Sequence, residues 1–309
     1  MKHYLGSRHF LPAVLALLLS TLTACTRHET PPAAPASAVT GAPKTYALTG
    51  EVIALAPERS ALLVRHEEIP GYMPAMTMEF IVTPADLIRL KEGQRLRARM
   101  LYDEKNELHL EDIELIDAVK EREVNAAAAS LRQDTTMRGK GAYREIGETV
   151  PQFSLYNQAG DVVSLNRFRG RAVVLNFIYT RCPIATMCPA STLRMMALQR
   201  AAKDQGITNL ELVSITLDPV YDTPSVLKNY ADVRGIDSAN FTFLTGPESA
   251  VRDLLHQFGV IVEPGENYLK HTLSTLLIDE QGKIIHRVDG TAWKPNDFLH
   301  RLSATKKSP

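Results

Sequence analysis

The spacing of hydrophobic positions changes about halfway along the chain. From about residue 145 onward, short apolar runs alternate with longer helix-like segments, and Ala172–Tyr179 is apolar almost throughout, as in a strand buried on both faces. The predicted order is strand 172–179, helix 189–203, strand 210–217, helix 224–233, strand 241–244, helix 247–258, paired strands 273–279 and 283–288, and helix 294–302. Strands that alternate with helices and end in a hairpin predict an α/β sheet.

The region from residue 45 to about 118 has the shorter period of β-strands. Polar and apolar residues alternate in Gln94–Tyr102 and in Glu107–Ile116. Three further strand candidates precede them, at 46–55, 61–66 and 76–82. Five short strands in about seventy residues favour a small closed barrel such as an OB-fold.

The segment 119–144 is charged and rich in alanine, and it lacks an apolar face wide enough for a core. We expect a linker there, helical only in part through Ala126–Ala129. The expected fold class is therefore two domains: a small all-β OB-like barrel over 45–118, followed by an α/β thioredoxin-like domain over 145–305.

The N-terminus has the pattern of an export signal. A positively charged start precedes the apolar run Phe10–Leu22, which is too short to span a membrane comfortably and leads directly to Thr23-Ala24-Cys25. This ending resembles a bacterial lipobox, which implies a signal peptide over 1–24, a lipidated Cys25, and a flexible Pro- and Ala-rich tether over 25–44. The alternative is an ordinary signal peptide with a stray cysteine. We expect an exported, membrane-anchored lipoprotein that faces the periplasm.

Charge and cysteine content narrow the possible functions. Lys+Arg and Asp+Glu number 35 each, so there is no basic excess of the kind that points to nucleic acid as a partner. The chain has 3 cysteines, and if Cys25 carries lipid, Cys182 and Cys188 remain as a pair. In an oxidising compartment two free thiols tend to form a disulfide unless a metal or a reductant holds them apart.

The two remaining cysteines lie at positions that favour a reactive or metal-binding thiol. Cys182 follows the predicted strand 172–179, and Cys188 lies at the start of the predicted helix 189–203. Sites in open α/β sheets lie at the carboxyl ends of strands, and a helix N-terminus lowers the pKa of a thiol. Far downstream, His271 opens another apolar run. Two thiolates and an imidazole form a soft ligand set that suits copper, especially Cu(I), but the same thiols could act as a redox pair or form a plain disulfide.

Several separated motifs follow one another in the chain. They are Tyr179-Thr180-Arg181-Cys182-Pro183, Val213-Ser214-Ile215-Thr216-Leu217-Asp218-Pro219, Asp222-Thr223-Pro224, Leu227-Lys228-Asn229-Tyr230-Ala231, and His271-Thr272 followed by Leu277-Ile278-Asp279. In this order they resemble the Sco/SenC family over residues 145–303. That family has a thioredoxin-like fold, binds copper through two cysteines and one histidine, and helps to assemble the CuA centre of cytochrome c oxidase.

The resemblance implies Cys182, Cys188 and His271 as ligands of Cu(I) or Cu(II), with Asp218 close to the site. The family usually places three residues between its two cysteines, whereas five separate them in this chain.

A second candidate site lies in the predicted barrel, where His66 precedes Met73-Pro74-Ala75-Met76-Thr77-Met78. In a strand, Met76 and Met78 point to the same face. Two thioethers and an imidazole are neutral, soft ligands that select Cu(I) over Zn(II), although a methionine pair at this spacing can also simply pack in a core.

The stretch resembles the CusF family of periplasmic Cu(I)- and Ag(I)-binding proteins. These are small OB-like barrels with one histidine and two methionines as ligands and a tryptophan stacked on the metal. The match implies His66, Met76 and Met78 as ligands. Met73 stands at the position of the tryptophan, as a third thioether ligand or as an apolar lid.

These features favour a lipid-anchored copper metallochaperone rather than an enzyme. The barrel would pass copper to the thiolate site, and that site would deliver it to a copper-accepting protein, most simply the CuA subunit of cytochrome c oxidase. One alternative is a thiol–disulfide oxidoreductase in which Cys182 and Cys188 are the redox pair, served by a thiol–disulfide reductant. Another is copper buffering for resistance. A peroxidase of the same fold is less favoured, because a second cysteine lies so close to the first and a histidine follows downstream.

Overall fold

The computed structural model describes residues 45–265 and 268–305. The expected signal peptide, Cys25 and the tether lie outside these described residues. Within them, none of the helices combines the length and the apolar character that crossing a membrane would need.

The first folded unit is rich in β-structure and holds five strands and one short helix. The elements are β1 (Thr45–Ala56), β2 (Ala61–His66), β3 (Met76–Ile81), α1 (Pro84–Arg89), β4 (Arg95–Tyr102) and β5 (Leu108–Leu115). The strand order is β1-β2-β3-β5-β4, and β4 also pairs with β1, so the sheet closes on itself. Every second residue of β4 from Leu96 to Met100 is buried, as the alternating sequence predicts.

Gly50 determines how closely β1 approaches β2. A Cβ atom at this position would lie 2.7 Å from Cγ1 of Val64 and 2.8 Å from the carbonyl oxygen of Arg65. Gly50 pairs with His66, the last residue of β2, so only glycine allows the two strands to pack this tightly beside that histidine.

The segment expected as a linker contains a long helix, α2 (Ala118–Arg138). Asp117 caps its start, because its side chain accepts hydrogen bonds from two backbone amides. Leu131 of α2 is buried in the core of the second folded unit. Arg132 Nε donates to Asp253 at 2.5 Å, on the helix α5 (Glu248–Gln257). The structure therefore differs from the expected, only partly helical linker, because a buried leucine and an ion pair with α5 together hold this helix in place.

The second unit is built on a seven-stranded sheet in the order β14-β13-β8-β9-β10-β6-β7. The strands are β6 (Ser154–Asn157), β7 (Val162–Ser164), β8 (Ala172–Ile178), β9 (Leu210–Thr216), β10 (Phe241–Thr245), β13 (Ser274–Ile278) and β14 (Ile284–Asp289). β8, β9 and β10 are parallel, and β13 runs antiparallel to β8. The α/β sheet that the sequence predicts is present. The strands β6 and β7 at one edge were not predicted.

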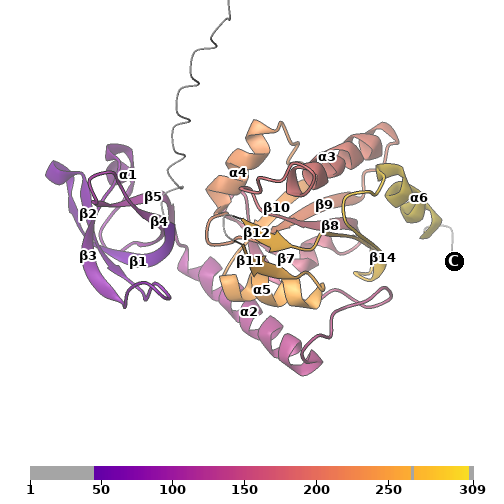
Figure 1. The fold of residues 1–309 in the computed structure, drawn as a ribbon, viewed down its shortest axis with the longest axis horizontal. Helices are drawn as coiled ribbons and strands as arrows, with labels where there is room; N and C mark the ends of the chain where they lie inside the picture. Colours follow the sequence, from indigo (N-terminus) through magenta and orange to yellow (C-terminus); the bar gives the residue numbers. More distant parts are fainter. Residues whose placement is uncertain (1–44, 266–267, 306–309) are drawn as a thin grey trace, which may run out of the picture. The chain divides into compact units, whose positions relative to one another are not determined.

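Helices cover both faces of this sheet. They are α3 (Cys188–Asp204), α4 (Pro224–Val233), α5, and α6 (Pro295–Thr305). α3 lies on one side of the sheet, whereas α5 and α2 lie on the other (Figure 1). A separate two-stranded sheet is formed by β11 (Val262–Pro264) and β12 (Leu269–His271).

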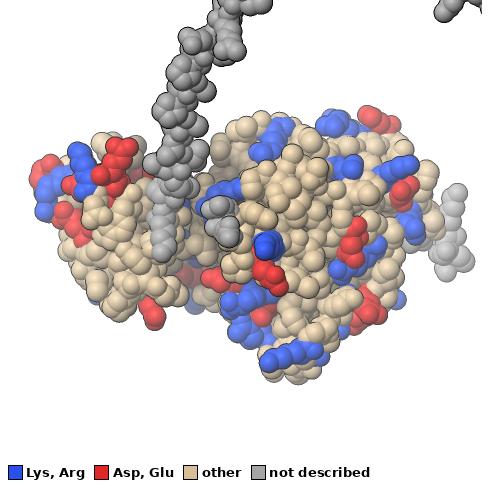
Figure 2. Space-filling model, in the orientation of Figure 1, with Lys and Arg blue, Asp and Glu red and all other residues tan. Residues whose placement is uncertain are grey.

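Charges of both signs are interspersed over the face of the molecule in Figure 2, with no broad basic surface there. This distribution agrees with the formal net charge of zero.

Candidate metal centres

Three side chains from distant parts of the sequence meet at the carboxyl end of β8. The ligand atoms of Cys182, Cys188 and His271 all lie within 4.8 Å of one another. Cys182 is 9% exposed and Cys188 is fully buried, and both are free thiols. The structure therefore brings together the three residues that the sequence singled out in this half of the chain.

The five residues between the cysteines are folded tightly enough for the two sulfurs to converge. Cys182 follows β8 in a turn in which its amide donates to the carbonyl of Tyr179. A second turn brings the amide of Met187 to the carbonyl of Ile184 at 2.9 Å, and α3 begins at the next residue. Pro189 occupies the first turn of this helix, where its missing N–H leaves no hydrogen bond unmade.

The imidazole of His271 is oriented by its neighbours. Nδ1 lies 3.0 Å from the carbonyl oxygen of Thr272, so Nδ1 carries the proton and Nε2 presents its lone pair. Nε2 lies 3.3 Å from Sγ of Cys188, which donates its thiol proton to it. The ring of Tyr179 meets the imidazole edge-to-face at 5.6 Å.

Burial favours the neutral forms of Cys188 and His271. It raises the pKa of the Cys188 thiol far above its ordinary value and lowers the pKa of His271. The hydrogen bond from the thiol to the neutral imidazole leaves neither buried group without a partner. A soft cation at this point would replace the thiol proton and would compensate the buried thiolate charge.

Asp222 is a residue of this site that sequence reasoning missed. Its carboxylate is fully buried and accepts hydrogen bonds from the amide and the hydroxyl of Thr180, the former at 3.1 Å, and from Thr216 Oγ1 at 2.6 Å. Burial raises the pKa of Asp222 to about 6. Asp222 precedes α4 directly before its cap, but the cap is Thr223, whose hydroxyl accepts the amide of Val226. Asp222 instead fixes the backbone two residues before Cys182.

Asp218, expected close to the site, lies at its edge. Its carboxylate pairs with the guanidinium of Arg181 at 2.7 Å, and that arginine also lies over the ring of Tyr221. Asp218 therefore acts on the chain next to Cys182, while Asp222 holds the buried side of the same turn.

In the first folded unit, one ring nitrogen of the buried His66 lacks a hydrogen-bond partner among the described residues. The residue is 1% exposed, its Nδ1 lies 2.7 Å from the carbonyl oxygen of Glu67, and Nε2 has no hydrogen-bond partner among the described residues. His66 pairs directly with Met76 across β2 and β3, and Met78 is the next residue on the same face. A buried nitrogen without a partner costs free energy, and a soft cation beside two thioethers would satisfy it.

Met73 lies in the loop that precedes β3. It forms an isolated bridge with Ile69 and packs against the core of this unit. Its neighbour Tyr72 stacks on Tyr46 at 3.9 Å and shares a hydrogen bond of 2.6 Å with the hydroxyl of Tyr102. The chain lacks a tryptophan in this unit, and this tyrosine cluster is an aromatic feature that the sequence pattern did not reveal.

A further group with metal-ligating atoms consists of Asp103, Glu107 and His109. Asp103 accepts the amides of Lys105 and Glu107 and contacts His109 at 3.2 Å. These bonds shape the turn between β4 and β5, and they account for the cluster without a metal.

Comparison with known proteins finds two family models along the chain. The model described as SCO1/SenC matches residues 141–306, and the model described as copper binding periplasmic protein CusF matches residues 45–115. Both agree with the resemblances seen in the motifs. The expectation of a thioredoxin-like fold in the C-terminal half is thereby confirmed.

Individual relatives match the C-terminal half. A SCO1 protein homolog from Bacillus subtilis is 33% identical over 154 residues, which make up 48% of this chain and 78% of that protein. A putative copper-binding protein from Stutzerimonas stutzeri is 29% identical over 140 residues, or 44% of this chain and 66% of that protein. The crystal structure of a SCO1/SenC family lipoprotein from Bacillus anthracis has 25% identity and a TM-score of 0.49, and covers 54% of this chain and 100% of its own.

Proposed function

Because the chain belongs to the SCO1/SenC family, we propose that it is a copper metallochaperone that delivers copper to an extracytoplasmic target, the CuA centre of cytochrome c oxidase. The observation that carries this proposal is the convergence of Cys182, Cys188 and His271, whose ligand atoms lie within 4.8 Å of one another. Two sulfurs and an imidazole nitrogen suit Cu(I) better than they suit hard cations.

The cargo would be held by the two sulfurs and by Nε2 of His271. Copper uptake releases the Cys188 proton that the imidazole now accepts, so the site exchanges a proton for a metal ion. Cys182 keeps 9% of its surface exposed while Cys188 has none. A ligand from the recipient protein would therefore reach the metal on the side of Cys182. Cys188 would be the last ligand to dissociate from the copper.

The proposal extends to a second copper site in the CusF-like unit, with His66, Met76 and Met78 as ligands. Its support is the unpartnered Nε2 of His66 directly opposite Met76. Met73, which like Met78 packs against the core of this unit, would either add a third thioether ligand or cover the site as an apolar lid. Neutral thioethers hold Cu(I) less tightly than thiolates do, so transfer from this site to Cys182 and Cys188 runs downhill. An export signal and a lipid on Cys25 would hold the protein at the periplasmic face of a membrane.

Copper stoichiometry tests both sites. The reduced full chain should bind two equivalents of Cu(I), of which Cys182→Ser should remove one and Met76→Leu the other. Met100→Leu is a matched control for the second variant, because Met100 is fully buried on β4 in the core of the same unit. A wild-type protein that binds no copper would overturn the proposal.

The second candidate function is thiol–disulfide exchange with the cysteines of a partner. Two free thiols that lie close together favour it, but the raised pKa of Cys188 leaves that residue a poor nucleophile at neutral pH, so Cys182 would have to attack. His271→Ala separates the two functions. A metallochaperone loses activity with this change, whereas a reductase keeps most of it. Deletion strains distinguish copper delivery from copper buffering, since loss of delivery impairs oxidase assembly and loss of buffering raises copper sensitivity.

A further inference from the structure

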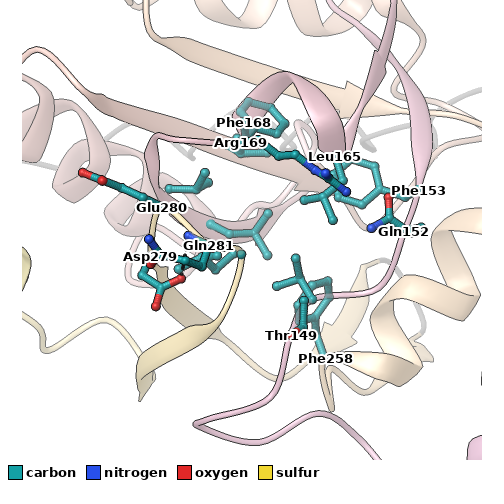
Figure 3. Close-up of a pocket in the computed structure, with 16 residues that line it drawn as sticks. Thr149, Gln152, Phe153, Leu165, Phe168, Arg169, Phe258, Asp279, Glu280 and Gln281 are labelled. Carbon is teal, nitrogen blue, oxygen red and sulfur yellow. Dashed lines mark hydrogen bonds between the residues drawn. The ribbon is translucent and has the colours of Figure 1, made fainter. Parts of the chain in front are cut away.

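A cavity of about 410 Å³ lies at the other end of the sheet from the thiols. Figure 3 shows the residues that line it. Val173 lines it near the start of β8, and Ile278, which pairs with Val173, lines it from β13. β8 then runs five residues further to Ile178 before the turn that carries Cys182, a distance of roughly 16 Å at the rise of a strand. The cavity is therefore separate from the candidate copper site.

The walls of the cavity are mostly apolar and come from several separate segments. Phe153 precedes β6, Leu165 and Phe168 lie on the short 3-10 helix after β7, Leu175 is on β8, and Phe258 follows α5. Each of these side chains is at most 8% exposed. Protein interiors are normally packed without such space, and unfilled apolar volume costs stability. Walls fixed by several segments make a preformed pocket of the kind that binds small molecules.

The mouth of the cavity carries an unpaired positive charge. Arg169 and Gln152 are exposed there, and in the part of the chain that the structure describes neither side chain has an ion-pair or hydrogen-bond partner. Figure 3 shows the guanidinium end of Arg169 extended toward Gln152 and Leu165. The acidic groups at the opposite side of the mouth are already engaged. Asp279 accepts the amides of two residues in its own turn, and Glu280 accepts Asn209 at 2.5 Å.

We infer that this cavity binds a small amphiphilic carboxylic acid, namely a free fatty acid of medium chain length. The acyl chain fills the space between Phe153, Phe168 and Leu175, the carboxylate pairs with Arg169, and the amide of Gln152 donates a hydrogen bond. The volume lies in the lower part of the range for small-molecule pockets, which suits one acyl chain and excludes a folded peptide. A guanidinium can pair with a carboxylate through two parallel hydrogen bonds.

The first test is calorimetric titration of the full chain with dodecanoate and, in parallel, with dodecanol. The inference expects one dodecanoate per chain. Arg169→Gln should weaken dodecanoate binding about tenfold and leave dodecanol binding unchanged, since only the acid uses the guanidinium. Arg167→Gln is the matched control, because Arg167 is exposed on the same short helix and does not line the cavity. No binding of dodecanoate, or equal losses with both variants, would overturn the inference.

A second test fills the cavity from within. Val173→Phe should abolish binding of both ligands while the copper stoichiometry at the cysteines stays as in the wild type, which shows that the variant is folded. If Val173→Phe does not fold, Leu165→Phe at the more accessible wall gives the same readout, because Leu165 is 8% exposed. Unchanged dodecanoate affinity in a folded cavity-filled variant would place the ligand elsewhere and refute the inference. Copper binding enters only as a folding control, so this inference and the proposed function can fail separately.

Discussion

Sγ of Cys188 lies 3.3 Å from Nε2 of His271, and the opposite nitrogen of that ring is held by the carbonyl of Thr272. The two hydrogen bonds fix both the tautomer and the orientation of the imidazole. A buried thiol and a neutral imidazole thus face one another with a proton between them, at the point where a soft cation would replace that proton.

The first prediction concerns His271 as a ligand. His271→Ala should lower the Cu(I) affinity of the thiol site by at least about 100-fold, because even the loss of a residue that only orients a metal ligand costs 10- to 100-fold. Competition with a Cu(I) chelator measures this, and a thiol titration should still find Cys182 and Cys188 reduced. His300→Ala, an exposed histidine on α6, is the control. Equal affinities for the two variants would remove His271 from the site.

Copper affinity at this site should rise with pH. The pKa of Cys188 is raised by burial, so its proton is still bound at neutral pH and must leave when the metal binds. Between pH 6 and 8 we expect at least about one proton released per copper bound, measured by calorimetry in buffers of different ionisation enthalpy. Affinity that does not change over this interval would mean that the sulfur is not a ligand, or that it is ionised before copper arrives.

Asp222 should make the wild type less stable as pH rises from about 4 to about 6. Its pKa is raised from 3.8 to about 6 in the folded protein, so the folded state binds more protons than the unfolded state within this window. The free energy of unfolding should fall there by up to about 3 kcal/mol relative to Asp222→Asn, which cannot ionise. Urea unfolding of both proteins at several pH values measures their difference in free energy of unfolding. The contributions of other titrating groups cancel in this difference, because both proteins contain them. If this difference in free energy of unfolding stayed constant between pH 4 and pH 7, the raised pKa of Asp222 would be contradicted.

Gly50→Ala should damage the CusF-like unit alone. The added methyl group would meet Val64 Cγ1 and the carbonyl oxygen of Arg65 below 3.0 Å, which forces β1 away from the end of β2 that carries His66. We expect a loss of about 1–3 kcal/mol in the stability of this unit and the loss of its Cu(I) equivalent, while the equivalent at the cysteines is kept. Full retention of both copper equivalents and of the unfolding midpoint would show that the strands can separate without harm to His66.

Much of the fold follows from local patterns in the sequence. The apolar run 172–179 predicts a buried strand, and Pro189 marks the start of a helix, so the positions of Cys182 after a strand and of Cys188 at a helix start are both readable. The short alternating strands before residue 118 are readable for the same reason.

Other features have no local signature. α2 has almost no apolar face, and it is held by contacts such as Arg132 with Asp253, 121 residues apart. Asp222 looks like a helix cap because the aspartate precedes Thr223-Pro224, yet its carboxylate turns inward to Thr180. No local pattern predicts the cavity beside Arg169 either, since unfilled space depends on how several segments pack together.

The sequence by itself determined which elements form and which side chains could bind a soft metal, because periodicity, proline, glycine and ligand chemistry act over a few residues. The tertiary structure alone decided that Sγ of Cys188 and Nε2 of His271, 83 residues apart, lie 3.3 Å from one another. It also decided that Nδ1 of this histidine carries the ring proton. That meeting depends on the order of the strands, on the pairing of β11 with β12 and on the Thr272 carbonyl, and these are set by the packing of the whole domain.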